Sequence, residues 1–90
     1  MYVVENGSKY AVNIDNAERI QAVFDVETKE YCIDLQKYDG TYICTLGKYD
    51  DKEAAECALS NLLFEISRGC KLYHMLERKL AYGLAHEKRI

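Results

Sequence analysis

The sequence of 90 residues contains no proline, only five glycines and only two histidines. No stretch is rich in proline or glycine, so we expect no linker or low-complexity segment, and we find no internal repeat of about 20 to 50 residues. No apolar run is long enough to cross a bilayer, and no basic region followed by an apolar one opens the chain. These absences predict one small folded domain in a soluble, cytoplasmic protein.

The four cysteines, at positions 32, 44, 57 and 70, form no CxxC pair and match no zinc-binding spacing. Thiols stay reduced in the cytoplasm, so we expect free cysteines that pack as small apolar side chains. A disulfide pair is the second interpretation of these residues, and a metal site is the third.

The residue types that usually carry catalysis do not assemble into a site. Neither His74 nor His86 has a partner at a recurring ligand spacing, and Cys70 lies too far from His74 along a strand to hydrogen-bond with it. Helix capping accounts for the carboxylates at 50, 51, 53 and 56, and the glycines are too scattered to cradle a phosphate. We therefore predict that the protein is not an enzyme and has no catalytic residue, metal or cofactor.

Residues 50–68 (DDKEAAECALSNLLFEISR) form the one long segment with a clear helical period. Asp50 is the expected N-cap, with Glu53 three residues later, and Gly69 follows as the stop signal. The apolar positions that recur at steps of three and four are Ala55, Ala58, Leu59, Leu62, Leu63 and Ile66. A lone amphipathic helix cannot bury this stripe, so the strands before it must supply a sheet.

Short strands are predicted on both sides of turn signals. Segments 1–5 and 8–14 flank Asn6-Gly7, which is typical of a two-residue type I′ hairpin. The expected pairs are Val3 with Tyr10 and Met1 with Val12.

Three further strands, 20–27, 30–38 and 41–47, follow with turns at Thr28-Lys29 and Asp39-Gly40. Two-residue turns pair Phe24 with Ile33 and Leu35 with Cys44. Thr-Lys is a poor type I′ turn, so a longer loop is the alternative there, and two extra loop residues would leave the same side chains on the same face of the sheet. The remaining expected pairs are Ala22 with Leu35, Val26 with Tyr31 and Ile33 with Leu46. The predicted apolar face comprises Ala22, Phe24, Val26, Ile33, Leu35, Cys44 and Leu46.

The predicted fold is therefore α+β: an antiparallel meander of about five strands with the helix of residues 50–68 packed on one face. A short strand at 70–75 and a helix at 76–90 complete the chain. We expect a single domain over residues 1–75 and a helical extension over 76–90, which packs on the outer face of the sheet or on a second copy.

The string LGKYDDKEAAECALSNLLFEISRGCKLYHM, with VNIDNAERI earlier in the chain, resembles small uncharacterised proteins of Gram-positive bacteria and their prophages. Those proteins share an opening hydrophobic-Asn-hydrophobic stretch, a Leu-Gly-x-Tyr before a capped Ala- and Leu-rich helix, and a terminal Tyr-x-Met. The matching residues are Leu46, Gly47, Tyr49, Ala54, Ala55, Leu59, Leu62, Tyr73 and Met75. The resemblance covers about residues 10–75, implies a sheet-plus-helix fold and a mobile-element origin, and brings no catalytic residue; the segment after Met75 departs from it.

Eight tyrosines and a leucine-lined tail favour protein recognition, because tyrosine is enriched at interfaces. We expect a non-enzymatic interaction module that binds a host or phage protein of unknown identity, and a homodimer with Leu80 and Leu84 at the contact. The candidate interaction residues are Tyr38, Ile43, Tyr73, Leu80, Tyr82 and Leu84.

Charge supplies the alternative function. The net charge is −3, but residues 1–69 carry 13 acidic and 7 basic side chains, whereas residues 70–90 carry 2 acidic and 5 basic ones. An acidic body disfavours phosphate-driven binding, which needs a basic face. The alternative is thus a nucleic-acid-directed protein that binds through its basic tail or imitates a polyanion with its body.

Overall fold

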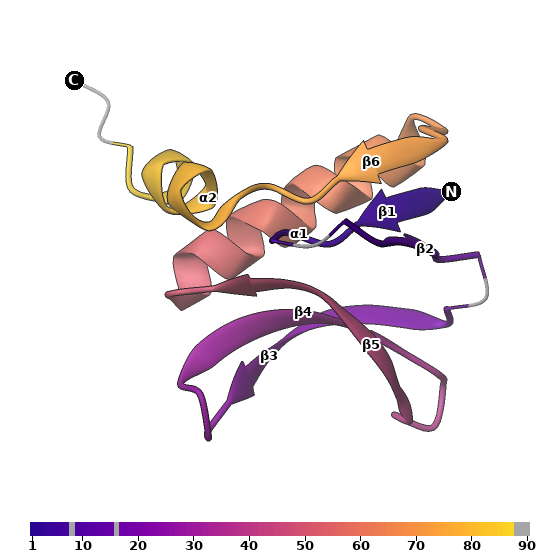
Figure 1. The fold of residues 1–90 in the computed structure, drawn as a ribbon, viewed down its shortest axis with the longest axis horizontal. Helices are drawn as coiled ribbons and strands as arrows, with labels where there is room; N and C mark the ends of the chain where they lie inside the picture. The colour runs from indigo at the N-terminus through magenta and orange to yellow at the C-terminus, as the bar shows by residue number, and fades with distance from the viewer. Residues whose placement is uncertain (8, 16, 88–90) are drawn as a thin grey trace.

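The computed structural model describes residues 1–7, 9–15 and 17–87, and Figure 1 shows their arrangement. Within these ranges the chain forms six strands and two helices. In order they are β1 (Tyr2–Val4), β2 (Ala11–Asn13), β3 (Arg19–Asp25), β4 (Glu30–Gln36), β5 (Tyr42–Tyr49), α1 (Lys52–Ser67), β6 (Leu72–His74) and α2 (Arg78–Ala85).

The strands form two sheets of three strands each, in the orders β2-β1-β6 and β3-β4-β5. The α+β class is as predicted, and the meander is present in β3, β4 and β5, which pair antiparallel. The prediction of one continuous sheet fails at the first hairpin, because β1 pairs on its other side with β6 in parallel. The strand predicted at 70–75 is thus present in part, and it lies beside β1, near the N-terminus (Figure 1).

The first hairpin has a longer loop than the predicted two-residue turn. Val3 lies opposite Val12, and not Tyr10, so the register is shifted by two residues. An even shift keeps the same side chains on the same face, which is why Val3 is still fully buried. Ser8, which belongs to the predicted strand 8–14, lies outside the described residues.

Asn6 and Gly7 lie in a turn, as predicted, but within a longer loop, and Asn6 also lies against β5. Its main-chain N–H donates to the Leu46 carbonyl at 3.2 Å. Its side-chain amide donates to the Lys48 carbonyl at 3.1 Å and accepts from the Lys48 N–H at 3.1 Å. One side chain thus reproduces the pair of hydrogen bonds that a neighbouring strand would make, and it occupies this part of the β5 edge.

The β3–β4 hairpin has the longer loop that the poor turn signal allowed. Residues 26–29 form the turn, with Lys29 at a φ of 59°, and Ala22 pairs with Ile33 instead of Leu35. The inward and outward alternation of side chains along β3 is as predicted, but the predicted apolar face is not buried at its end. Val26 lies in the turn and is 74% exposed, and Phe24 is 45% exposed.

The β4–β5 pairing follows the prediction at Leu35 and Cys44, but a register shift then places Gly47, and not Leu46, opposite Ile33. The fully buried Tyr49 ring lies over Gly47, where an added Cβ would come within 2.9 Å of the ring. The Tyr49 hydroxyl donates to the Leu76 carbonyl at 2.8 Å. The Leu-Gly-x-Tyr segment therefore connects β5 to the residues just before α2.

Helix α1 begins one residue later than predicted. The N-cap is Asp51, and not Asp50, because the Asp51 backbone is extended and its carboxylate accepts from the Ala54 N–H at 2.8 Å. At the other end Gly69 has a φ of 74°, and the N–H groups of Gly69 and Cys70 donate to the carbonyls of Ile66 and Glu65. This pair of bonds is a Schellman motif, which ends the helix at the predicted glycine.

Helix α1 packs on the β3-β4-β5 sheet and on α2. Its fully buried residues are Ala54, Ala55, Ala58 and Leu62. Two residues of the predicted apolar stripe, Leu63 and Ile66, are instead 49% and 37% exposed. The sheet therefore covers a narrower part of α1 than its apolar pattern predicts.

Helix α2 is shorter than the predicted helix 76–90 and packs on α1, whereas the prediction was the outer face of the sheet or a second copy. Ala81 is fully buried in the same cluster as Met75, across the expected boundary between residues 1–75 and 76–90. Residues 88–90, including the basic side chains at 88 and 89, lie outside the described residues. None of the helices in the described ranges is long and apolar enough to span a bilayer.

Candidate interaction surfaces

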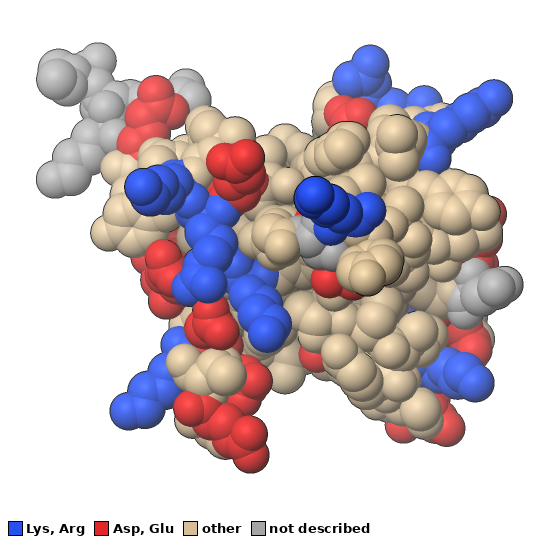
Figure 2. All heavy atoms as spheres, viewed as in Figure 1, with Lys and Arg blue, Asp and Glu red and all other residues tan. Residues whose placement is uncertain are grey.

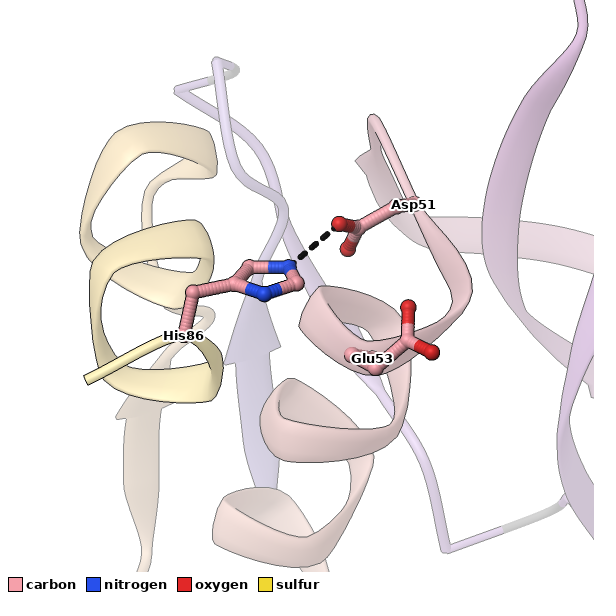
Figure 3. Close-up of side chains that lie close together, drawn as sticks. All are labelled: Asp51, Glu53 and His86. Carbon is pink, nitrogen blue, oxygen red and sulfur yellow. Dashed lines mark hydrogen bonds and ion pairs between the residues drawn. The ribbon is translucent and has the colours of Figure 1, made fainter. Parts of the chain in front are cut away.

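Polar side-chain contacts hold helix α2 at both of its ends. At its start, the Arg78 guanidinium pairs with Glu30 at 2.7 Å and also with Asp50. At its end, the His86 Nε2 lies 2.5 Å from the Asp51 Oδ2 (Figure 3). The helix has eight residues and its N-cap makes no side-chain hydrogen bond, so these tertiary contacts replace local capping.

Asp51 contacts both the start of α1 and the residue that follows α2. One carboxylate oxygen caps α1 and the other faces His86, which follows α2. The Ala54 N–H is the main cause of a lowered pKa of the Asp51 carboxyl; desolvation opposes this effect, and His86 adds to it. Asp51 is therefore charged at neutral pH and stabilises both the α1 terminus and the contact with α2.

Glu53, in the first turn of α1, completes a group of three potential metal ligands with Asp51 and His86 (Figure 3). Their donor atoms lie within 4.8 Å of one another, and carboxylate and imidazole are ligands that Zn²⁺ accepts. Both oxygens of Asp51 already have protein partners, however, so the arrangement is explained as a link between the helices. The sequence spacing concealed this link because Asp51 and His86 are 35 positions apart.

Three predicted interaction residues, Leu80, Tyr82 and Leu84, lie on α2 and are 52%, 49% and 46% exposed. Leu80 and Leu84 are one turn apart and share one side of the helix. Tyr82 lies on another side, where its ring contacts the His86 ring with centroids 4.3 Å apart. The helix thus presents two leucines on one flank and an aromatic pair on the other.

The other three predicted residues lie elsewhere. Tyr38 is in the turn between β4 and β5 and is 77% exposed, and Ile43 on β5 is 40% exposed. Tyr73 on β6 is half-buried, its hydroxyl donates to the Asn61 side chain of α1, and burial raises its pKa. The structure therefore does not unite the six predicted residues in one surface.

A hollow of about 380 Å³ lies beside α2, lined by Asn6, Gly7, Lys48, Glu77, Arg78 and Lys79. It contains three cations, but Arg78 is committed to two carboxylates and Glu77 lies in the same wall. Figure 2 shows positive and negative side chains interleaved over this part of the molecule. The surface around α2 is thus mixed in charge and is not a basic patch.

A second hollow, of about 500 Å³, lies on the outer face of the β3-β4-β5 sheet. A hydrogen-bonded chain crosses it from the Tyr42 hydroxyl to Thr45 and on to the Asp34 carboxylate, at 3.0 and 2.8 Å. Cys32 lies in the same hollow, and burial, aided by the negative charge of Asp34, raises the pKa of its thiol. The thiol is therefore protonated at neutral pH, which does not favour a nucleophile.

A third surface, between β3 and α1, was not identified from the sequence. The inward side chains Ile20 and Ala22 of β3 are partly buried, and Leu59, Leu63 and Ile66 follow one another on α1 at steps of four and three. Ile20 and Ile66 line one hollow of about 460 Å³, so this flank of α1 faces β3. Leu63 and Ile66 were expected in the buried apolar stripe of the helix, and the position of α1 on the sheet leaves them exposed.

Comparison with known proteins finds no matching family model, no matching curated protein and no matching solved structure. The relation to prophage proteins implied by the Leu-Gly-x-Tyr and Tyr-x-Met motifs therefore stays a prediction. Any assignment of function depends on the geometry of the surfaces described above.

Proposed function

We propose that the protein is a non-enzymatic interaction module that binds a protein partner through helix α2. The supporting observation is that α2 is fixed in place and yet leaves its larger apolar side chains outside. Arg78 and His86 hold its two ends, Ala81 is buried beneath it, and Leu80 and Leu84 are about half exposed. A helix that is already ordered loses little conformational freedom on binding, and helix recognition in a groove uses apolar anchors at this spacing.

The partner in this proposal is a protein with an apolar groove, consistent with the predicted host or phage target. Lys79 lies beside Leu80 in sequence, so an acidic residue at the rim of that groove would match its charge. The proposal assigns no reaction to the chain. It assigns a structural role to Asp51 and His86, which keep α2 in the presented position.

Nucleic-acid binding remains the alternative, but it has less support from the described residues. Lys48 and Lys79 share their hollow with Glu77, and the Arg78 charge is balanced by Glu30 and Asp50. A phosphate backbone is usually bound by several cations without competing carboxylates. A gel-shift series over salt tests this alternative, and steeply salt-dependent binding would favour it over a protein partner.

The test of the proposal is affinity purification of the intact tagged chain from cells that naturally produce it. Leu80→Lys introduces a charge at the centre of the proposed contact, and Leu72→Lys on β6 is the matched control because Leu72 is 54% exposed and Leu80 is 52% exposed. We expect a partner that co-purifies with the natural chain and with Leu72→Lys but is lost with Leu80→Lys. Circular dichroism checks that both variants are folded.

Two results would count against this role for α2. One is recovery of the protein alone in every growth state that is sampled. The other is a partner that is retained equally by both lysine variants, since the binding surface would then lie elsewhere.

A further inference from the structure

Strand β3 is an edge strand of seven residues in the β3-β4-β5 sheet. It pairs with β4 on one side, and no described strand pairs with its other side. An edge strand presents unpaired N–H and C=O groups that can accept another strand. In the same sheet β4 is central, and Asn6 occupies part of the β5 edge. The sheet can thus be extended most readily at β3.

The usual protections of an edge strand are weak here. The edge strands of the other sheet, β2 and β6, have only three residues each, which limits their capacity for pairing. By contrast, the middle of β3, from Ile20 to Phe24, contains no charged residue. A charge or a proline in the middle of an edge strand would oppose the addition of another strand.

Apolar side chains lie next to this edge and are incompletely covered. Phe24 is 45% exposed on β3, and Leu63 and Ile66 on the facing flank of α1 are 49% and 37% exposed. Ile20 and Ile66 line the same hollow, together with residues between β2 and β3 and residues that follow α1. A strand added to β3 would place its inward side chains against this flank and remove them from water.

We propose that β3 pairs with β3 of a second copy of this chain, antiparallel and about a two-fold axis at Ala22. Ala22 is the central residue of Arg19–Asp25, so this register uses the whole strand. It places Arg19 opposite Asp25 of the second copy and Ile20 opposite Phe24 of the second copy. Residues that are directly opposite share a face, so the apolar side chains meet on the α1 side.

The charges at the two ends of β3 identify a second copy as the occupant. Arg19 is exposed and has no ion pair within the described part of the chain. Asp25 accepts a hydrogen bond from the Glu27 N–H at 2.9 Å, and this bond, followed by contacts with Thr28, lowers the pKa of its carboxyl, which is therefore charged at neutral pH. The two-fold axis creates two Arg19–Asp25 contacts, and opposite charges across a strand pair stabilise it. The strand is therefore complementary to itself.

The same contact would complete the apolar surface. Phe24 of the second copy would lie beside Ile20, next to the flank of α1 that carries Ile66 and Leu63. A six-stranded sheet would result, with both copies of α1 on one face. Pairing consumes the open β3 edge of each copy, so a two-fold contact closes the assembly at two chains. This contact is separate from the surface of α2 proposed above and does not depend on it.

Sedimentation equilibrium of the intact chain over a concentration series tests the pairing. We expect the mass to approach twice 10.4 kDa for the natural chain. R19D and D25R each place like charges opposite one another at both ends of the contact, and each is expected to raise the dissociation constant by about tenfold or more. An equimolar mixture of R19D and D25R restores opposite charges at both ends and should form a dimer again.

The mixture separates this pairing from a general folding defect, because damaged chains would not recover on mixing. L63K, on the flank of α1, should also weaken the dimer, whereas L80K, with similar exposure, should leave it unchanged. A natural chain that stays at 10.4 kDa up to millimolar concentration would overturn the proposal. So would a dimer that is lost only with L80K, which would place the contact at Leu80 and Leu84, as the leucine spacing predicts.

Discussion

The two ends of helix α1 are built differently, although both carry apolar side chains at helical spacing. At its start, Ala54, Ala55 and Ala58 are fully buried, and Asp51 links the helix to His86 beyond α2. At its end, Leu63 and Ile66 are substantially exposed beside the open edge of β3. The start is thus stabilised within one chain, whereas the end offers apolar surface that a second chain can cover. The apolar period of a helix therefore predicts which of its sides is apolar, but it does not predict which neighbouring segment covers that side.

The largest loss of stability is expected at Leu62 of α1, and the adjacent Leu63 should differ from it. Leu62 is fully buried and Leu63 is 49% exposed. Leu62→Ala should lower the free energy of unfolding by about 2–5 kcal/mol through lost burial and a residual cavity. Leu63→Ala should change it by less than about 1 kcal/mol in the monomer. Urea unfolding at low protein concentration measures both, and equal losses would show that α1 is covered on both flanks.

A smaller effect is expected where β5 supports the start of α1. A Cβ at Gly47 would come within 2.9 Å of the Tyr49 ring, so Gly47→Ala should cost about 1–3 kcal/mol through overpacking. The control is Gly83→Ala in α2, where an added Cβ meets nothing within 4 Å. That variant should instead stabilise the protein by up to about 1 kcal/mol, because alanine favours the helix. Thermal unfolding of both variants tests the opposite signs.

The next effect separates the two aspartates before α1. Asp51→Ala removes the N-cap and should lower the free energy of unfolding more than Asp50→Ala, which removes an exposed ion pair with Arg78. The folded pKa of Asp51 lies below its ordinary value of 3.8, so its contribution is present above that pH and is lost as the pH falls through the lowered pKa. Urea unfolding from neutral pH to about pH 3 should therefore show a weaker acid dependence for Asp51→Ala. An equal loss in the two variants would contradict the assignment of the cap.

The smallest expected effect concerns the hydroxyl that joins β5 to the segment before α2. Tyr49→Phe removes the hydrogen bond to the Leu76 carbonyl and should cost about 0.5–1.5 kcal/mol at neutral pH. Burial is the main cause that raises the pKa of Tyr49 well above its ordinary value of 10.0. Stability from the neutral phenol is therefore present below about pH 10 and falls as the unfolded chain ionises above that pH.

Tyr49→Phe should consequently lose less stability than the natural chain between neutral and strongly alkaline pH. Tyr82→Phe is the control, because Tyr82 is 49% exposed and its hydroxyl makes no hydrogen bond within the described residues. Parallel alkaline profiles for the natural chain and Tyr49→Phe would show that this phenol is not the group responsible.

Much of the secondary structure was predictable because its determinants lie close together in the sequence. The apolar period of α1 and the stop at Gly69 identify the helix within a few residues of Lys52–Ser67. The alternation in β3 and β4 also gave the correct inward face for Ile33 and Leu35, although the loop is two residues longer. A two-residue error in a loop does not change which side of a strand faces the core.

The candidate surfaces were less predictable because they join distant segments. The contacts of Arg78 with Glu30 and of His86 with Asp51 depend on where α2 lies, and no local pattern specifies that position. Tyr73 was expected at the surface, but its hydroxyl reaches Asn61 of α1 because β6 pairs with β1 beside that helix. Which flank of α1 is left exposed, with Leu63 and Ile66, depends on how the helix lies on the sheet.

The α+β class, the long helix and the phase of the three-stranded meander could all be predicted from the sequence. These features depend on periods of 2 and 3.6 residues and on turn residues, which act over a few positions. The pairing of β1 with β6, the position of Asn6 along β5 and the packing of α2 on α1 became visible in the three-dimensional structure alone. Periodicity orients a side chain toward or away from the core, but the choice of neighbour depends on how all the segments fill that core together.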